Sequence, residues 1–320
     1  MKNVYLGAIS IMFAAFLWAV DGVVLTPWVL KLGMTDIPTF VFMLHATSSV
    51  FLLYFYFKRF SGLKNLDKKD WVSFLLVAFF GGALGTMAIV AAISIVYSQG
   101  LNISVVLLLQ KLQPVFALLL AFIFLKEKLQ KSFYVWALLA LLGSYLLTFG
   151  FSFGSIDFSG MFRPALLSVI AAFSFGASTV FSKRAVDKIS HSLGTALRFI
   201  LTTTLMLIII LFLTFFKKIG LETSYLGLAG FSLLNIKSLF VFILIALTTG
   251  GTSIFIYYYG LKRVLASKST IYELVFPFSS ILLEFFIHGK ILWLGQWIGL
   301  IIILLAVFKI TKTKRKSIRI

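Results

Sequence analysis

The sequence predicts an all-α membrane protein, with ten transmembrane helices arranged as two inverted five-helix repeats. Three observations lead to this prediction. The 320 residues are 61% hydrophobic and 12% charged, with a mean hydropathy of +1.06, whereas soluble domains carry about 25% charged residues. The apolar residues also fall into runs of the length that a helix needs to cross a bilayer. Finally, two of these runs share a polar pattern around a proline.

The predicted spans follow the apolar runs in chain order. Residues 1–150 form the predicted first repeat, with spans at Tyr5–Thr26, Ile37–Phe57, Trp71–Tyr97, Leu101–Leu125 and Ser132–Phe149. Residues 151–320 form the predicted second repeat, with spans at Phe162–Phe181, Leu193–Phe216, Leu239–Gly260, Lys268–His288 and Ile291–Ile310, followed by a basic tail. The longest connection, Lys217–Ser238, has room for a short surface helix.

The distribution of positive charge predicts the orientation. With the N-terminus inside, the inner segments hold 21 of the 29 Lys and Arg residues and the outer segments hold six. Cytoplasmic segments of membrane proteins carry such an excess of basic residues, so we expect a multi-pass protein of the cell (inner) membrane with both termini cytosolic. Because each half has an odd number of spans, corresponding connections lie on opposite sides, and the repeat is inverted.

The two proline-containing runs, Leu107–Leu129 and Ser269–Lys290, match each other at an offset of 163 residues, which aligns Gln110 with Glu273. A proline removes the hydrogen bond to the carbonyl four residues earlier. Pro114 and Pro277 are therefore the predicted helix breaks, and they free the carbonyls of Gln110 and Glu273. Broken helices at corresponding positions of two halves are typical of transporter binding sites.

Polar residues inside the spans are the candidate substrate-binding residues, because charged groups at membrane depth need a partner or a watery cavity. The predicted set is Lys111, Gln110, Gln113, Asp21, Glu273 and Arg198. Lys111 is either a substrate-binding cation or a structural lysine that pairs with Asp21 or is capped by the freed carbonyls. Glu273 is either a site for a proton or a substrate amine, or an ion-pair partner of Arg198. Arg198 could also extend to the membrane interface.

The remaining polar and aromatic positions have plainer interpretations. Asp21 could also pair with His45, which by itself is expected to be a packing residue. Glu284 and His288 are expected at the outer rim. Residues 257–259, three tyrosines, are expected in an interfacial aromatic belt, with cavity lining as the alternative.

Several segments resemble the EamA-type transporters of the drug/metabolite transporter superfamily. They are 15–19 (AFLWA), 101–129 (LNIS, QKLQP and LKEKL) and 261–299 (LKRVLAS, ELVFP and WLGQWIG). The resemblance implies ten helices around a central cavity and alternating access, usually for export of amino acids or other small metabolites. The family's two repeats commonly end this segment with Glu. Here the first has Glu127 and the second has Lys290, so a symmetric carboxylate pair is not expected.

Other classes of function are less well supported by the sequence. There is no cysteine, there are three histidines, and Asp21 is the sole Asp expected inside a span, so we expect neither an enzyme nor a metal or cofactor. The positive charges do not form a basic face with interleaved aromatics, which argues against nucleic acid. The expected partners are a small-molecule substrate, membrane lipids and, if transport is coupled, protons. A passive channel or lipid scramblase remains the alternative.

Overall fold

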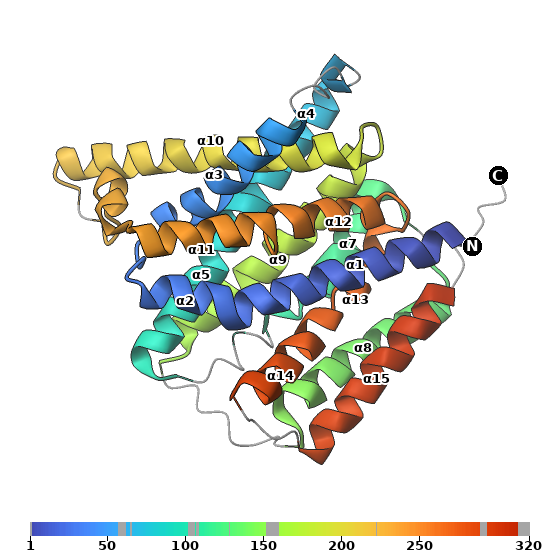
Figure 1. Cartoon of the computed structure of the whole chain (residues 1–320). Helices are drawn as coiled ribbons and strands as arrows, with labels where there is room; N and C mark the ends of the chain where they lie inside the picture. The colour runs from blue at the N-terminus through green and yellow to red at the C-terminus, as the bar shows by residue number, and fades with distance from the viewer. Residues whose placement is uncertain are drawn as a thin grey trace.

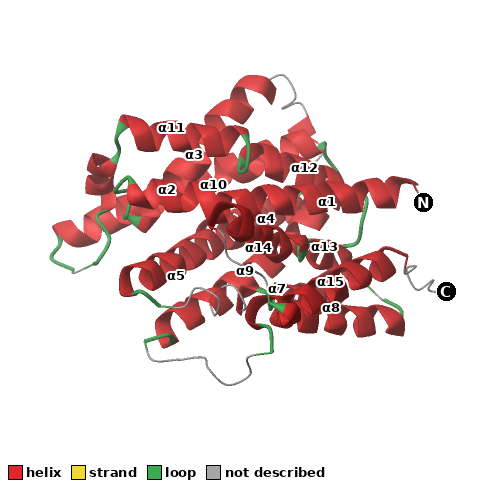
Figure 2. Ribbon diagram, turned by 60° about the horizontal axis from the view of Figure 1, so that its bottom comes forward, coloured by secondary structure: helices red, strands yellow, loops and turns green. Residues whose placement is uncertain are grey.

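The computed structural model describes residues 2–56, 62–64, 66–101, 106, 109–127, 129–151, 160–221, 223–288 and 293–312. Every secondary-structure element in these ranges is a helix (Figures 1 and 2). Eight helical segments are long and apolar enough to cross a membrane, and two shorter apolar helices, Gln113–Leu125 and Lys131–Leu147, accompany them. The all-α membrane class is therefore confirmed, while the count of ten crossings stays a prediction.

The first half begins with one long rod made of α1 (Lys2–Val20), the wider π-helical segment η1 (Asp21–Leu25) and α2 (Thr26–Lys31). The helix α3 (Ile37–Tyr56) follows. A second rod consists of α4 (Lys68–Val77), the π-helical segment η3 (Ala78–Leu84) and α5 (Gly85–Gln99). The half ends with α7 (Gln113–Leu125) and α8 (Lys131–Phe149).

The second half repeats this order. It consists of α9 (Phe162–Val186), α10 (His191–Lys218), the 3₁₀ helix η4 (Gly227–Leu233), α11 (Ile236–Leu247), α12 (Gly251–Leu261), α13 (Ala266–Tyr272), α14 (Val275–His288) and α15 (Leu294–Lys312). The helix η4 confirms the short helix expected in the longest connection. The ends of most other helices differ from the predicted spans by a few residues, because hydropathy does not register the polar first and last turns. The exception is α7, which begins at Gln113, whereas the predicted span begins at Leu101.

The two halves pack through matching contacts. The first helix of one half, α1, packs against α12 and α14, and the first helix of the other, α9, packs against α4, α5 and α7. The second helices, α3 and α10, pack together, as do the last helices, α8 and α15. Figure 1 shows the α8–α15 pair at one side of the bundle. Most helices of each half are therefore supported by the other half rather than by their own.

Connections that the sequence places on the same side of the membrane meet in the structure. At one end of the bundle, Lys188 Nζ lies 2.7 Å from the carboxylates of both Asp67 and Asp70. At the other end, Leu226 N–H donates to Asp36 Oδ1 at 2.8 Å. The N-terminal part of α1 lies at the Lys188 end, where Gly7 adjoins Arg263. We refer below to the Lys188 end and the Asp36 end.

The two breaks lie at corresponding places, but they are made differently from the prediction. The chain turns at Lys111 and Leu112, and Pro114 stands in the first turn of α7. The second break falls between α13 and α14, before Pro277. The Glu273 carbonyl, predicted to be freed, accepts the Phe276 N–H at 2.9 Å. Because the tighter turn brings the Phe276 N–H to this carbonyl, the carbonyl needs no hydrogen-bond donor from a ligand.

Candidate functional site

A cavity of about 950 Å³ lies between the two halves of the molecule. Both helix breaks open onto it, together with η1 and parts of α5, α9, α10 and α12. The structure brings every predicted site residue to its wall: Asp21, Gln110, Lys111, Gln113, Pro114, Arg198, Glu273 and Pro277. These residues come from four separate spans, so only the folded chain assembles them.

Glu273 is the best-connected group in the cavity. Gln113 Nε2 donates to its Oε2 at 2.7 Å, and the Tyr257 hydroxyl donates to its Oε1 at 2.8 Å. The first contact joins the two breaks, since Gln113 begins α7 and Glu273 follows α13. The alternative that Glu273 pairs with Arg198 does not appear among the ion pairs of the described residues.

Arg198 reaches the cavity from α10 through two long contacts. Its guanidinium lies 3.5 Å from the Tyr258 hydroxyl and 3.5 Å from the Gly81 carbonyl. Its Nε is buried and has no hydrogen-bond partner within the described part of the chain. The side chain therefore stays in the protein interior rather than extending to the membrane interface, and it keeps donor capacity for a ligand.

Lys111 is buried, at 6% exposure, in the turn before α7. Its Nζ lies 4.4 Å from the centroid of the Phe276 ring, a cation–π contact between the two breaks. Within the described residues no ion pair joins it to Asp21 or any other carboxylate. A buried ammonium without a counter-ion is costly, which makes Lys111 a strong candidate for contact with a polar ligand.

Asp21 is the first residue of η1, the widened segment in the first rod. Such π-helical turns often occur at functional sites. Its Oδ1 atom is buried and lacks a hydrogen-bond partner within the described ranges, as does Oγ of Ser178 across the cavity. His45 also lines the cavity, but its Nδ1 donates to the Val41 carbonyl at 2.8 Å. Asp21 therefore has unused acceptor capacity, and His45 fits its expected packing role.

Aromatic side chains close the cavity toward the Lys188 end. The Tyr257 ring lies 5.3 Å from the Trp18 ring, and its hydroxyl lies 3.1 Å from Thr179 Oγ1. Behind it, the fully buried Tyr258 contacts Ser182 at 2.9 Å. The first expectation for these tyrosines, an interfacial belt, is wrong for Tyr257 and Tyr258, because both turn inward to partners on α9.

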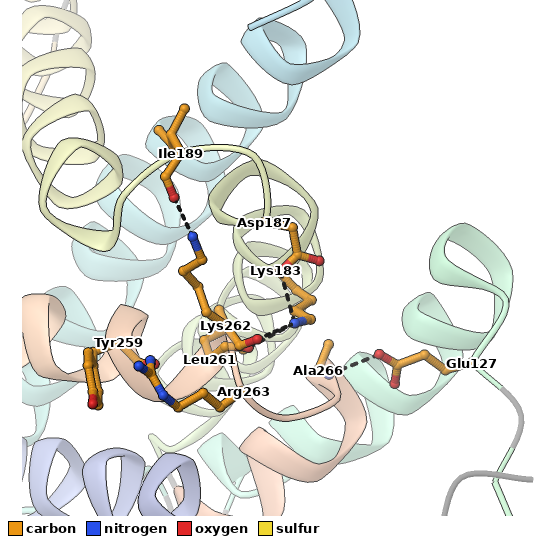
Figure 3. A network of polar contacts seen from close by, with 9 residues as sticks. All are labelled: Glu127, Lys183, Asp187, Ile189, Tyr259, Leu261, Lys262, Arg263 and Ala266. Carbon is orange, nitrogen blue, oxygen red and sulfur yellow. Dashed lines mark hydrogen bonds and ion pairs between the residues drawn. The ribbon is translucent and has the colours of Figure 1, made fainter. Parts of the chain in front are cut away.

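Beyond this aromatic layer, polar contacts join the elements at the Lys188 end (Figure 3). Lys183 Nζ donates to the Leu261 carbonyl at 3.0 Å, and Lys262 Nζ donates to the Ile189 carbonyl at 2.6 Å. Glu127, from the first half, accepts the Ala266 N–H at 3.0 Å and so caps α13 of the second half. The Glu127 contact joins the two halves on this side of the cavity, and the two lysine contacts hold α9 to α12 within the second half.

The Asp67–Lys188 ion pair also joins the two halves at this end of the bundle. It stays charged over a wide pH range. The hydrogen bond from Lys188 lowers the pKa of the Asp67 carboxyl from 3.8 to about 2. The same bond raises the pKa of Lys188. Both groups are therefore ionised at neutral pH, and the connection between the halves does not titrate there.

Toward the Asp36 end the cavity is lined by residues near helix ends, including Tyr97, Trp293 and Gln296. Trp293 is 79% exposed. Sequence reasoning did not select Trp18, Phe276 or Gln296, since isolated aromatics and one amide near a span end carry no distinguishing pattern. The side chains of Glu284 and His288 lie outside the described residues, so their predicted place at the rim stays a prediction.

The composition of the cavity wall suits the binding of a small organic molecule. Across the part of the chain that the structure describes, no group of three His, Cys, Asp or Glu side chains could hold a metal ion. The wall combines aromatic rings, three amides, two cations and two carboxylates. Ligand cavities of about 300–1,000 Å³ with a few placed polar groups usually take small organic molecules.

Comparison with known proteins points in the same direction. Residues 5–149 and 162–312 each match the EamA-like transporter family. A riboflavin transporter, ImpX, of Fusobacterium nucleatum is 38% identical over 314 residues, which cover 98% of this chain and 99% of that protein. One crystal structure has a TM-score of 0.68 at 15% identity, over 96% of this chain and 97% of the other, which indicates a shared fold.

Proposed function

The chain belongs to the EamA-like transporter family, and on that premise we propose that it moves a small polar metabolite across the membrane by alternating access. It is a transporter rather than an enzyme. The observation that carries the mechanism is the cavity of about 950 Å³ between the halves, with both helix breaks on its wall. In this proposal the substrate binds there while the halves move relative to each other.

We propose ten crossings in two inverted halves, 1–150 and 151–320, with both termini cytosolic. The matching contacts between the halves support this arrangement, as does the grouping of connections at the two ends. With this orientation the cavity reaches toward the outside through Tyr97 and Trp293 and is closed toward the cytosol at Tyr257. The observed state is then the outward-facing one.

For the substrate we propose riboflavin or a closely similar flavin. The transporter ImpX supports this choice. The cavity supports it as well, since aromatic side chains, Trp18 and Phe276 among them, line it and planar rings stack on such side chains. Gln110 and Gln113 offer amide groups to the ring's carbonyl and imide edge. Asp21 and Arg198 remain for hydroxyls of the side chain.

An amino acid is the second candidate substrate. It is favoured by the absence of ion pairs between the cations and carboxylates on the cavity wall within the described residues. Lys111 could then bind a carboxylate and Asp21 an ammonium group. Against this, an amino acid would occupy only a small part of the cavity.

Export is the direction that we propose from the family resemblance, with proton exchange at Glu273 as a form of coupling. Transport into right-side-out and inside-out vesicles, measured with and without a pH gradient, determines both.

Binding tests the substrate assignment first. The purified protein would be heated in detergent with riboflavin, amino acids, organic acids or nucleosides. A ligand at about 100 times its Kd adds about 2.7 kcal/mol to the stability of the folded state, so riboflavin should raise Tm and Lys111→Ala should reduce the shift. Lys217→Ala, an exposed lysine outside the cavity, is the control. A shift with amino acids alone would exclude the flavin assignment.

A further inference from the structure

A second concave site lies on the outside of the bundle, away from the central cavity. The helices α4 and α7 both pack against α9, and the groove lined by these three helices has a volume of about 310 Å³. Lys68 and Lys69 from α4 and Arg184 from α9 line the groove. All three side chains are exposed, and none takes part in an ion pair within the described residues.

The groove changes from basic to apolar along its length. On α4, Lys68 and Lys69 lie at the Lys188 end, and Val72 and Leu76 follow one and two turns farther along. On α9, Arg184 lies near the same end and Phe181 lies one turn farther from it. The apolar part therefore extends about 10 Å from the cations, from the helical rise per residue.

This order matches the order of groups in an anionic phospholipid. An outward-facing groove within a bilayer is covered by lipid, and the cations favour a negatively charged headgroup over a zwitterionic one. The Lys188 end is also the predicted cytosolic end, where anionic lipids give the membrane surface a negative potential. Basic pockets between transmembrane helices on that side are suited to such headgroups.

We propose that the groove between α4, α7 and α9 is a binding site for an anionic phospholipid, with the headgroup phosphate on Lys68, Lys69 and Arg184 and an acyl chain along Val72 and Phe181. This site is independent of the transported substrate. Its position gives it a role in stability, since the lipid would join α4 and α7 of the first half to α9 of the second.

Native mass spectrometry of the purified protein tests the proposal, with phosphatidylglycerol and phosphatidylcholine added in equal amounts. Wild type should retain one phosphatidylglycerol in preference. Lys69→Gln/Arg184→Gln should weaken that retention about thirty-fold, since each cation near an anionic surface contributes about five-fold. Lys131→Gln/Lys312→Gln, on α8 and α15 at the same end, should leave it unchanged. Equal losses in the two double variants would instead indicate general attraction to the basic face and overturn the site.

The apolar part of the groove has its own matched pair of variants. Val72 and Leu75 are 53% and 55% exposed on α4, but Val72 lines the groove and Leu75 does not. Val72→Trp should therefore displace phosphatidylglycerol, and Leu75→Trp should retain it. Equal retention of phosphatidylcholine by wild type, or displacement of the lipid by inorganic phosphate, would contradict the proposal.

Discussion

At the scale of single residues, the cavity wall presents polar groups that have unused hydrogen-bonding or ion-pairing capacity. Within the described residues, the Lys111 ammonium lies over the Phe276 ring and forms no ion pair with a carboxylate. The sequence predicted that Lys111, Gln113 and Glu273 would share a site, because polar and charged groups in apolar spans are rare. It could not predict the Gln113–Glu273 bond at 2.7 Å, which depends on the register between two helices far apart in the chain.

The prediction on coupling of transport to protons concerns Glu273. Replacing it with Gln removes the ionisable group but keeps an acceptor for Tyr257. If protons exchange at this site, Glu273→Gln proteoliposomes should lose accumulation driven by a pH gradient and retain substrate exchange. Tyr257→Phe, which leaves the carboxyl in place, should keep some response to the gradient. Wild-type protein that ignores the gradient would show that transport is facilitated diffusion or exchange.

The prediction on how the stability of the folded state changes with pH concerns Asp67. Its pKa is lowered from 3.8 to about 2 by Lys188, so the folded state gains stability from the pair above about pH 4 and loses it as the pH falls toward 2. The Asp67 contact is exposed and contributes little to the Tm difference between wild type and Lys188→Gln. The larger part of that difference should come from the loss of the contact to Asp70, whose side chain is buried. The Tm difference should be constant from pH 7 to pH 5 and shrink below pH 4.

Lys217→Gln, which removes an exposed lysine at the other end of the bundle, is the control for that series. If the Tm difference disappeared between pH 7 and pH 5, some group other than Asp67 would be responsible. Any pH dependence of transport near neutrality is then expected to arise in the cavity and not in this pair.

At the scale of elements, the sequence predicted where the helices break but not how. Both breaks lie next to the aligned prolines, where a proline in mid-span removes a helical hydrogen bond. The widened segments η1 and η3 contain no proline, and the hydropathy pattern does not distinguish them from an ordinary α-helix. Their geometry depends on packing between spans, which a single sequence does not display.

The contact between α8 and α15 yields a prediction on stability. A Cβ added at Gly299 would lie 2.5 Å from the Gly143 carbonyl, so Gly299→Ala must push the two helices apart. Overpacking of this kind costs about 1–3 kcal/mol, and the Tm in detergent should fall. Gly22→Ala is the matched control, because its Cβ would lie 3.8 Å from Phe276. Equal Tm values for the two variants would contradict the close packing of α8 on α15.

At the scale of the whole molecule, composition and charge sufficed to predict the all-α membrane class. The family resemblance rested on loose motifs, and the match over residues 5–149 and 162–312 confirms it. The substrate could not be predicted, because it depends on the shape of a cavity assembled from both halves. A few polar side chains are compatible with many small molecules.

The chain has no cysteine, which makes its topology directly testable. Single cysteines introduced at Asp67 and at Thr223 should react with an impermeant thiol reagent from opposite sides. We expect Asp67→Cys to be labelled only after the cytosolic face is opened, and Thr223→Cys to be labelled in intact cells. Labelling of both positions from the same side would exclude the proposed orientation and the inverted repeat.

The central claim is that a flavin-like substrate binds in the central cavity and is carried by alternating access. Counterflow of labelled riboflavin in proteoliposomes tests it most directly, since a passive channel or a scramblase cannot show this behaviour. Liposomes preloaded with unlabelled riboflavin should accumulate the label transiently and with saturable kinetics, and Lys111→Ala should reduce the initial rate at least ten-fold while Lys217→Ala does not. Flux that rises linearly with concentration, without counterflow and equally in all three proteins, would contradict the account.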